Sequence, residues 1–164
     1  MSTPSAAKAS APLDKLDLKI LRQYQDDTRQ PAERIATAVG LSTAAVQRRL
    51  RRMRETGVIE AEVAKIAPAK VGVPITCIVG VELVRETANG LQRFIAKMAR
   101  FKQVQQCYYV TGRMDFMLVV LARDMQAYDQ FMRKALLDDP NVRSYETHVV
   151  LTSAKTGTSV PVEL

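Results

Sequence analysis

Apolar residues recur with helical spacing in two short segments of the first third of the chain. Between Pro31 and Ile59 they lie three or four positions apart, as on one face of an amphipathic helix. We predict two helices whose apolar faces pack on each other, through Ile35, Ala36 and Val39 in the first and Val46, Leu50 and Met53 in the second. A tight turn must join these helices, because few residues separate the two patterns.

The residues at the ends of these segments are those that commonly begin and end helices. Pro31 suits the first turn of a helix, Gly40 suits the left-handed position after one, and Ser42 is a good N-cap. Further upstream, Asp14 and Asp17 have the spacing of a loose capping box, followed by an apolar stripe of Leu16, Ile20 and Tyr24. The pattern therefore predicts a helix-turn-helix backed by one further helix.

From residue 75 onward the apolar pattern is that of strands alternating with helices. Strands are expected over 75–84, 104–110, 116–122 and 142–151, and helices over 88–101 and 124–136. Strand-helix-strand thus occurs twice, with a tight connection at 111–115 between the two copies. This order is typical of the ferredoxin-like βαββαβ fold, a four-stranded antiparallel sheet with both helices on one face. The fold class of the whole chain is therefore expected to be α+β.

The other face of such a sheet has no cover within the chain. A second copy is the simplest cover, because an exposed apolar surface usually marks a subunit contact. We therefore expect a homodimer, in which the helix-turn-helix unit is present twice.

Positive charge is concentrated in the helix-turn-helix half of the chain. Residues 1–70 hold 13 basic and 8 acidic residues, a net charge of +5, whereas residues 71–164 hold 11 and 9, a net charge of +2. The second helix of the motif is the main source, since it carries Arg48, Arg49, Arg51, Arg52 and Arg54. Such a run is often only a solvated helix face. Directly after a helix-turn-helix turn, however, it indicates DNA binding.

We expect this second helix to enter the major groove of double-stranded DNA. Its N-terminal residues would meet base edges, where glutamine and arginine can make bidentate contacts, and its later arginines would hold phosphates. The predicted DNA-binding residues are Ser42, Thr43, Ala44, Gln47, Arg48, Arg49, Arg51 and Arg52.

The chain of 164 residues is long enough for two small domains. We expect a flexible tail over 1–12, a helix-turn-helix domain over 13–66 that ends in a strand over 58–66, a linker over 67–74 and a ferredoxin-like domain over 75–164. No stretch is long and apolar enough for a membrane span, and the tail lacks the apolar core of a secretory signal. Cys77 and Cys107 are isolated, which favours a reducing cytoplasm and gives no metal-site spacing.

Several segments together carry a family resemblance. These are LDKLDLKIL (13–21), ERIATAVGLSTAAVQRRLRRMRETGVI (33–59), the connection at 68–72, VTGRMDFML (110–118) and THVVL (147–151). In this order they resemble the leucine-responsive/asparagine regulator (Lrp/AsnC) family of prokaryotic transcription factors. The resemblance implies a winged helix-turn-helix domain, a linking strand and an amino-acid-sensing domain. It further implies a cytoplasmic, nucleoid-associated protein whose dimers can assemble into octamers and bind a small effector, commonly an amino acid.

The same resemblance implies an effector site at the turn formed by Gly112, Arg113, Met114 and Asp115. There the Asp115 carboxylate would meet the ligand ammonium group, the backbone amides at Gly112 would meet its carboxylate, and the Thr147 hydroxyl would donate a hydrogen bond. Arg113 replaces a residue that is often acidic or small in the family, so it adds positive charge at the pocket mouth. Taken singly, a Gly-x-x-Asp sequence is also ordinary hairpin chemistry.

Two other functions remain compatible with the residues. Some proteins of this architecture are sirohaem-type tetrapyrrole decarboxylases, which need pocket histidines or arginines, and this chain has one histidine, His148. A lone histidine on a strand is usually structural, because acid–base catalysis needs a positioned partner. Alternatively, the arginines could serve a DNA-organising protein of low sequence specificity. We predict no enzyme activity, no catalytic residues, no metal and no cofactor apart from the amino-acid effector.

Overall fold

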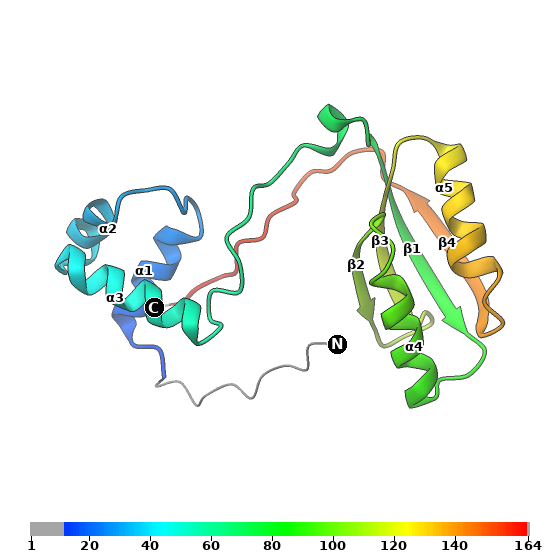
Figure 1. Cartoon of the computed structure of the whole chain (residues 1–164), viewed down its shortest axis with the longest axis horizontal. Helices are drawn as coiled ribbons and strands as arrows, with labels where there is room; N and C mark the ends of the chain where they lie inside the picture. Colours follow the sequence, from blue (N-terminus) through cyan, green and yellow to red (C-terminus); the bar gives the residue numbers. More distant parts are fainter. Residues whose placement is uncertain (1–11, 164) are drawn as a thin grey trace. The chain divides into compact units, whose positions relative to one another are not determined.

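The computed structural model describes residues 12–163, which form two compact units (Figure 1). One consists of residues 12–65 together with 156–163, and the other of residues 66–155. The tail predicted over 1–12 lies outside the described residues except for Pro12. The last residues, expected in the second domain, instead contact the first unit: the Gln25 side chain donates to the Val160 carbonyl at 3.1 Å and accepts from its N–H at 3.0 Å.

The first unit is built from the three predicted helices. Asp14 and Asp17 form the predicted capping box at the start of the first helix, since each carboxylate accepts the backbone N–H of the other residue, at 2.8 and 3.0 Å. Gly40 follows the second helix with a φ of 73°. The core contains Ile20, Tyr24, Ile35, Ala36, Val39, Val46, Leu50 and Met53. The helices are α1 (Lys15–Tyr24), α2 (Ala32–Val39) and α3 (Thr43–Glu55).

The strand expected over 58–66 does not form, so the described residues of this unit contain helices but no wing strand. Residues 60–66 are all exposed and form no strand ladder with any described segment. A β-rich composition is not enough for a strand, because an isolated extended segment gains neither ladder hydrogen bonds nor a buried face. The prediction of a strand in this segment was wrong.

The second unit has the predicted ferredoxin-like topology. Its antiparallel sheet has the strand order β2-β3-β1-β4, and helices α4 and α5 cover one face (Figure 1). A short 3-10 turn, η1 (Pro68–Val71), precedes the sheet, and a π-helical turn, η2 (Arg133–Leu137), continues α5. The other elements are β1 (Ile75–Leu83), α4 (Ala88–Met98), β2 (Val104–Tyr109), β3 (Phe116–Ala122), α5 (Met125–Met132) and β4 (Val142–Val149).

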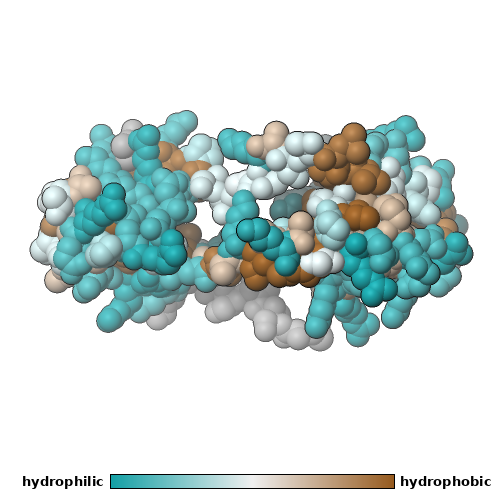
Figure 2. Space-filling view, turned by 90° about the horizontal axis from the view of Figure 1, so that it is seen from above, coloured by the Kyte–Doolittle hydropathy of each residue, from teal (hydrophilic) through white to brown (hydrophobic). Residues whose placement is uncertain are grey.

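Alternation along the central strands separates a buried face from an uncovered one. In β3 Phe116, Leu118, Val120 and Ala122 are buried beneath the helices, together with every second residue of β1 from Cys77. The opposite face carries Ile78, Met117, Val119 and Leu121, and no element of the described chain covers it. Figure 2 shows hydrophobic side chains exposed in the half of the view that contains the sheet, whereas the helical half is mostly hydrophilic.

Residue 80, on this uncovered face, is a glycine for a steric reason. A Cβ atom at residue 80 would lie 2.9 Å from Cγ of Met114, so the glycine leaves room for the methionine to pack flat on β1. Met114 thereby adds to the apolar surface of the sheet.

No helix of the described residues is long and apolar enough to cross a membrane.

Candidate functional site

The outer surface of α3 begins at a well-capped helix end. The Ser42 hydroxyl accepts the Ala45 backbone N–H at 3.2 Å, as expected of an N-cap. Val46, Leu50 and Met53 are buried against the other two helices, which fixes the rotation of α3 about its axis. The predicted contact residues Ser42, Ala44, Gln47, Arg48 and Arg51 are consequently exposed, and Thr43 is half-buried.

Two of the predicted DNA contacts face the protein instead. Asp17 is completely buried, and its Oδ1 accepts a hydrogen bond from Arg49 at 2.7 Å, while Arg52 pairs with Oδ2. Arg49 also reaches the Asp14 carboxylate at 2.7 Å. Arg49 and Arg52, both predicted to contact DNA, are thus ion-paired with carboxylates of their own unit. Their guanidinium groups neutralise a carboxylate that would otherwise be buried and unpaired, which is costly in a protein interior.

The charges in this cluster reinforce one another. The backbone N–H of Asp17 and the Arg49 guanidinium hold the pKa of Asp14 below its ordinary value. The hydrogen bonds that Arg49 donates to Asp17 and Asp14 in turn raise the pKa of Arg49. The negative end of each pair lies at the N-terminus of α1, where the helix dipole also favours a carboxylate. The cluster thus attaches α3 to α1 through charge-assisted hydrogen bonds.

Arg54 is occupied by a second cluster. Its Nε donates to Glu62 at 2.7 Å, and its Nη2 donates to the Tyr24 hydroxyl at 2.7 Å, with the guanidinium carbon 5.5 Å from the centre of the Tyr24 ring. Tyr24 itself donates to Glu62 at 2.8 Å. The Arg54 hydrogen bond lowers the pKa of Glu62. This cluster holds the segment after α3 against α1 even though that segment forms no strand.

The five arginines therefore divide into two groups. Arg49, Arg52 and Arg54 pair with carboxylates of their own unit, whereas Arg48 and Arg51 are exposed and have no ion pair within residues 12–163. The sequence pattern alone does not show which of these arginines have internal partners, and it gives Asp17 only a capping role. The capping-box spacing located this carboxylate on α1, but its arginine partners lie 32 and 35 residues away.

The predicted effector turn is present, and it has a structural role of its own. Gly112 has a φ of 121°, a conformation that L side chains rarely adopt. Asp115 is buried, and its Oδ2 accepts the Leu83 backbone N–H at 2.5 Å. Its backbone N–H donates to the Val81 carbonyl at 2.9 Å. One carboxylate oxygen of Asp115 is therefore already used to hold the end of β1, while Arg113 is exposed.

The Thr147 side chain contacts Tyr128 rather than this turn. Its hydroxyl lies 2.6 Å from the Tyr128 hydroxyl, on the helix-covered side of the sheet. Burial raises the pKa of Tyr128 to about 12, so the phenol stays protonated at neutral pH. In the ladder, Thr147 is opposite Val79, two residues before the Val81 carbonyl that Asp115 uses. If the Tyr128 hydroxyl donates in this pair, the Thr147 hydroxyl keeps its own hydrogen as a donor.

His148 lies on the uncovered face of the sheet. It is opposite Ile78 in the ladder and exposed, and its Nε2 is 3.6 Å from Oε1 of Glu146. It therefore lies on the opposite face from Tyr128 and Thr147 and contributes nothing to a helix-side pocket.

Together these features define the class of the protein: a helix-turn-helix unit with an exposed basic recognition helix, followed by a ferredoxin-like unit. Family models support the same division. Residues 13–54 match the AsnC-type helix-turn-helix domain, and residues 76–160 match the Lrp/AsnC ligand binding domain. The chain belongs to the Lrp/AsnC family of transcriptional regulators.

Individual relatives agree with this assignment. An uncharacterised HTH-type transcriptional regulator of Sinorhizobium fredii is 41% identical over 152 residues, covering 93% of this chain and 90% of the relative. The Bkd operon transcriptional regulator of Pseudomonas aeruginosa is 33% identical, covering 93% and 99%. Both relatives are named as transcriptional regulators.

Solved structures show the same architecture. An AsnC family transcriptional regulator from Agrobacterium tumefaciens has a TM-score of 0.84 at 32% identity, covering 91% of this chain and 97% of its own. A transcriptional regulator from Neisseria meningitidis, solved as a complex with L-Met, has a TM-score of 0.84 at 28% identity, covering 92% and 97%. The predicted family, fold class and regulatory function are confirmed.

Proposed function

We propose that this regulator recognises its operator with the outer surface of α3. Gln47, with Ser42, Thr43 and Ala44 around it, meets base edges in the major groove, and Arg48 and Arg51 hold phosphates. The observation that carries the proposal is the division of the arginines. Internal carboxylates occupy three of the five, and the remaining two are exposed on the same side of α3 as Gln47.

Salt dependence tests the phosphate contacts. The full-length protein is titrated by fluorescence anisotropy against a duplex selected from a random pool, at several salt concentrations. If Arg48 and Arg51 each neutralise one phosphate per subunit, the double variant Arg48→Ala/Arg51→Ala lowers the log–log salt slope of a dimer by about 3 to 4. The matched control is Arg85→Ala/Arg93→Ala, two exposed arginines of the other unit. An unchanged slope in the α3 variant would contradict the groove assignment.

The same titration separates base reading from backbone attraction. Gln47→Ala should reduce discrimination between the selected duplex and random duplexes by about 1 to 3 kcal/mol and leave the salt slope unchanged, because phosphate contacts alone set that slope. Equal affinity of the wild-type protein for selected and random duplexes would instead favour a DNA-organising protein of low specificity.

We further infer that the second unit dimerises through the uncovered sheet face. The apolar residues Ile78, Val119 and Met117 lie side by side on this face, where a second copy would bury them. Dimers of this kind place two recognition helices on one operator and could assemble further into octamers on the nucleoid. Sedimentation of Val119→Lys tests this contact, because a lysine in a symmetric apolar interface meets its own copy. A variant that sediments as the wild type does would contradict it.

The effector is proposed to be an amino acid bound at the turn of Gly112, Arg113 and Asp115, with no other cofactor. The complex of the similar Neisseria regulator with L-Met supports this ligand class. Asp115 has a second carboxylate oxygen that no described residue engages, and this oxygen is available to a ligand ammonium group.

A thermal-shift screen over the amino acids identifies the effector, since a ligand that binds the native state raises the unfolding midpoint. Asp115→Asn then tests the site. The asparagine carbonyl can still accept the Leu83 N–H but lacks the charge that attracts an ammonium group. We expect a folded variant without the ligand-induced shift. A full shift in this variant would place the effector elsewhere.

A further inference from the structure

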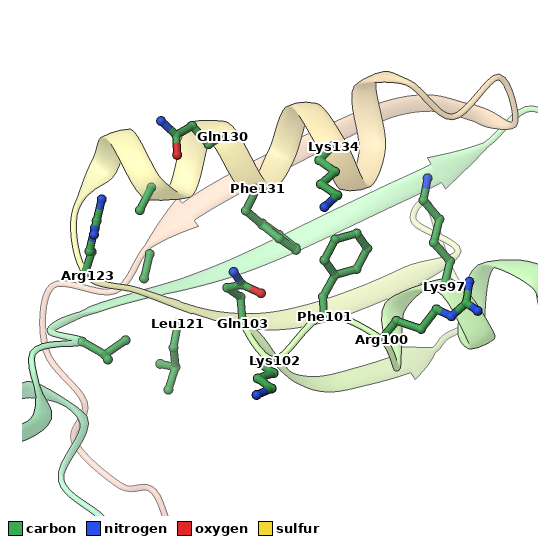
Figure 3. Close-up of a pocket in the computed structure, with 13 residues that line it drawn as sticks. Lys97, Arg100, Phe101, Lys102, Gln103, Leu121, Arg123, Gln130, Phe131 and Lys134 are labelled. Carbon is green, nitrogen blue, oxygen red and sulfur yellow. The ribbon is translucent and has the colours of Figure 1, made fainter.

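A second binding site is suggested by a cavity at the end of the sheet where β2 begins and β3 ends (Figure 3). This is the end opposite the 110–115 turn, because β2 runs toward that turn and β3 runs away from it. The cavity has a volume of about 990 Å³. It lies between the C-terminal end of α4 and one side of α5 and η2, where Ala127, Gln130, Phe131 and Lys134 line it. It is large enough for a mononucleotide-sized ligand.

The cavity is strongly basic. Among the described residues, five cationic side chains and no carboxylate line it. Lys97 is paired with Asp139 at 2.9 Å, and Arg123 is paired with Asp124 at 3.1 Å. The other three cations have no ion pair in the described part of the chain and are exposed; they are Arg100, Lys102 and Lys134. These three cations repel one another across the cavity. A ligand with several negative charges relieves this repulsion and is therefore favoured.

The floor of this basic cavity is aromatic. The rings of Phe101 and Phe131 meet edge to face with their centres 5.3 Å apart, and Phe131 is almost fully buried. In Figure 3 Lys134 extends from η2 toward the Phe101 ring, and Gln103 extends toward Phe131. The partly exposed Phe101 ring, with the carboxamides of Gln103 and Gln130 and several cations around it, suits a flat heterocycle that packs against the ring while its heteroatoms bond to the amides.

The helix that carries Lys134 is irregular at this position. α5 changes from α-helical to π-helical geometry at Arg133, and the π-helical turn continues to Leu137. Such turns often occur at functional sites because the added residue changes the direction of a side chain. Here the widened turn includes Lys134, which lines the cavity.

We propose that the basic cavity binds a nucleotide, with its phosphates at Arg100, Lys102 and Lys134 and its base against Phe101. A phosphate alone would use only the cations, and an uncharged nucleoside would use only the ring and amides. The full set of residues is used only by a ligand that has both parts. This site is separate from the amino-acid effector turn and gives the regulator a second input.

Calorimetric titration of the full-length, DNA-free protein with ADP, pyrophosphate and adenosine tests the proposal. We expect ADP to bind more tightly than either fragment. The variant Arg100→Gln/Lys134→Gln should weaken ADP binding by at least about tenfold, because it removes charge-assisted bonds. The exposed control Lys155→Gln, which lies outside the cavity, should bind as the wild type does. Absence of ADP binding, or undiminished binding by the double variant, overturns the proposal.

A second variant tests the aromatic part independently. Phe101→Leu keeps an apolar side chain but removes the stacking surface, so it should weaken ADP by about tenfold while leaving pyrophosphate unchanged. If pyrophosphate binds as tightly as ADP to the wild type, the cavity is an anion site only and the nucleotide assignment is overturned. If the Arg100→Gln/Lys134→Gln variant loses duplex DNA affinity and the wild type binds no ADP, the cations serve DNA instead. The amino-acid thermal shift should persist in all these variants, so failure here is distinct from failure of the effector proposal.

Discussion

Replacement of Asp17 by alanine is expected to disrupt the helical unit selectively. The change removes the carboxylate that accepts from Arg49 at 2.7 Å, from Arg52, and from the Asp14 backbone N–H at 3.0 Å. Breaking a buried ion pair costs about 3–5 kcal/mol when the remaining charge stays buried. The side chains of Arg49 and Arg52 are 21% and 39% exposed, so they regain part of their hydration.

After this discount, Asp17→Ala should lower the free energy of unfolding of the helical unit by about 2–4 kcal/mol. About 1 kcal/mol of this comes from the lost capping bond. That is a large share of the stability of so small a unit. The open population of the helical unit should consequently rise by about 30- to 1000-fold. Because α1 and α3 share the cluster, both should open more often.

Hydrogen exchange followed by mass spectrometry of the full-length protein measures this effect by segment. Peptides from α1 and α3 should exchange faster by that factor, while peptides from β1 and β3 serve as an internal reference in the other unit. Asp26→Ala, at an exposed carboxylate next to the same helix, is the matched control. Unchanged protection of α1 and α3 in the Asp17 variant would refute the view that this carboxylate attaches the recognition helix.

Three further outcomes follow from the structure. Gly80→Ala should destabilise the second unit by about 1–3 kcal/mol in urea unfolding, because its Cβ would lie 2.9 Å from Cγ of Met114; a neutral effect would mean that the methionine moves freely. Tyr128→Phe should cost about 1 kcal/mol by the same assay, since it leaves the Thr147 hydroxyl without its partner, and an equal stability would discount that bond. The lowered pKa of Glu62 makes a contribution to the stability of the helical unit that is fully present above the ordinary value of 4.5 and is lost as the pH falls through the lowered value. The protection factors of α1 amides, corrected for the intrinsic exchange rate at each pH, should therefore fall on acidification below 4.5. Glu62→Gln should remove this part of the pH dependence, and an unchanged pH dependence in that variant would contradict the assignment.

Local signals in the sequence were enough for most of the fold. Gly40 and Ser42 define a turn by their own backbone and side-chain preferences, and strict alternation in β3 defines which residues are buried. These properties depend on residues within a few positions of one another, so a sequence pattern records them. The strand predicted over 58–66 failed for the complementary reason. Its formation depends on a neighbouring strand, about which a local pattern contains no information.

Only the tertiary structure decided which arginines are exposed and which are ion-paired within the described residues. Arg48 and Arg49 are adjacent and chemically identical, yet one is exposed and the other reaches a carboxylate that is buried on a different helix. The same holds for the basic cavity, whose cations come from α4, the residues after it, the end of β3 and η2. Helical periodicity assigns a residue to one side of its own helix. Whether a charge on that side meets water or an opposite charge depends on how distant segments pack, and the range of the Coulomb interaction makes that packing decisive for function.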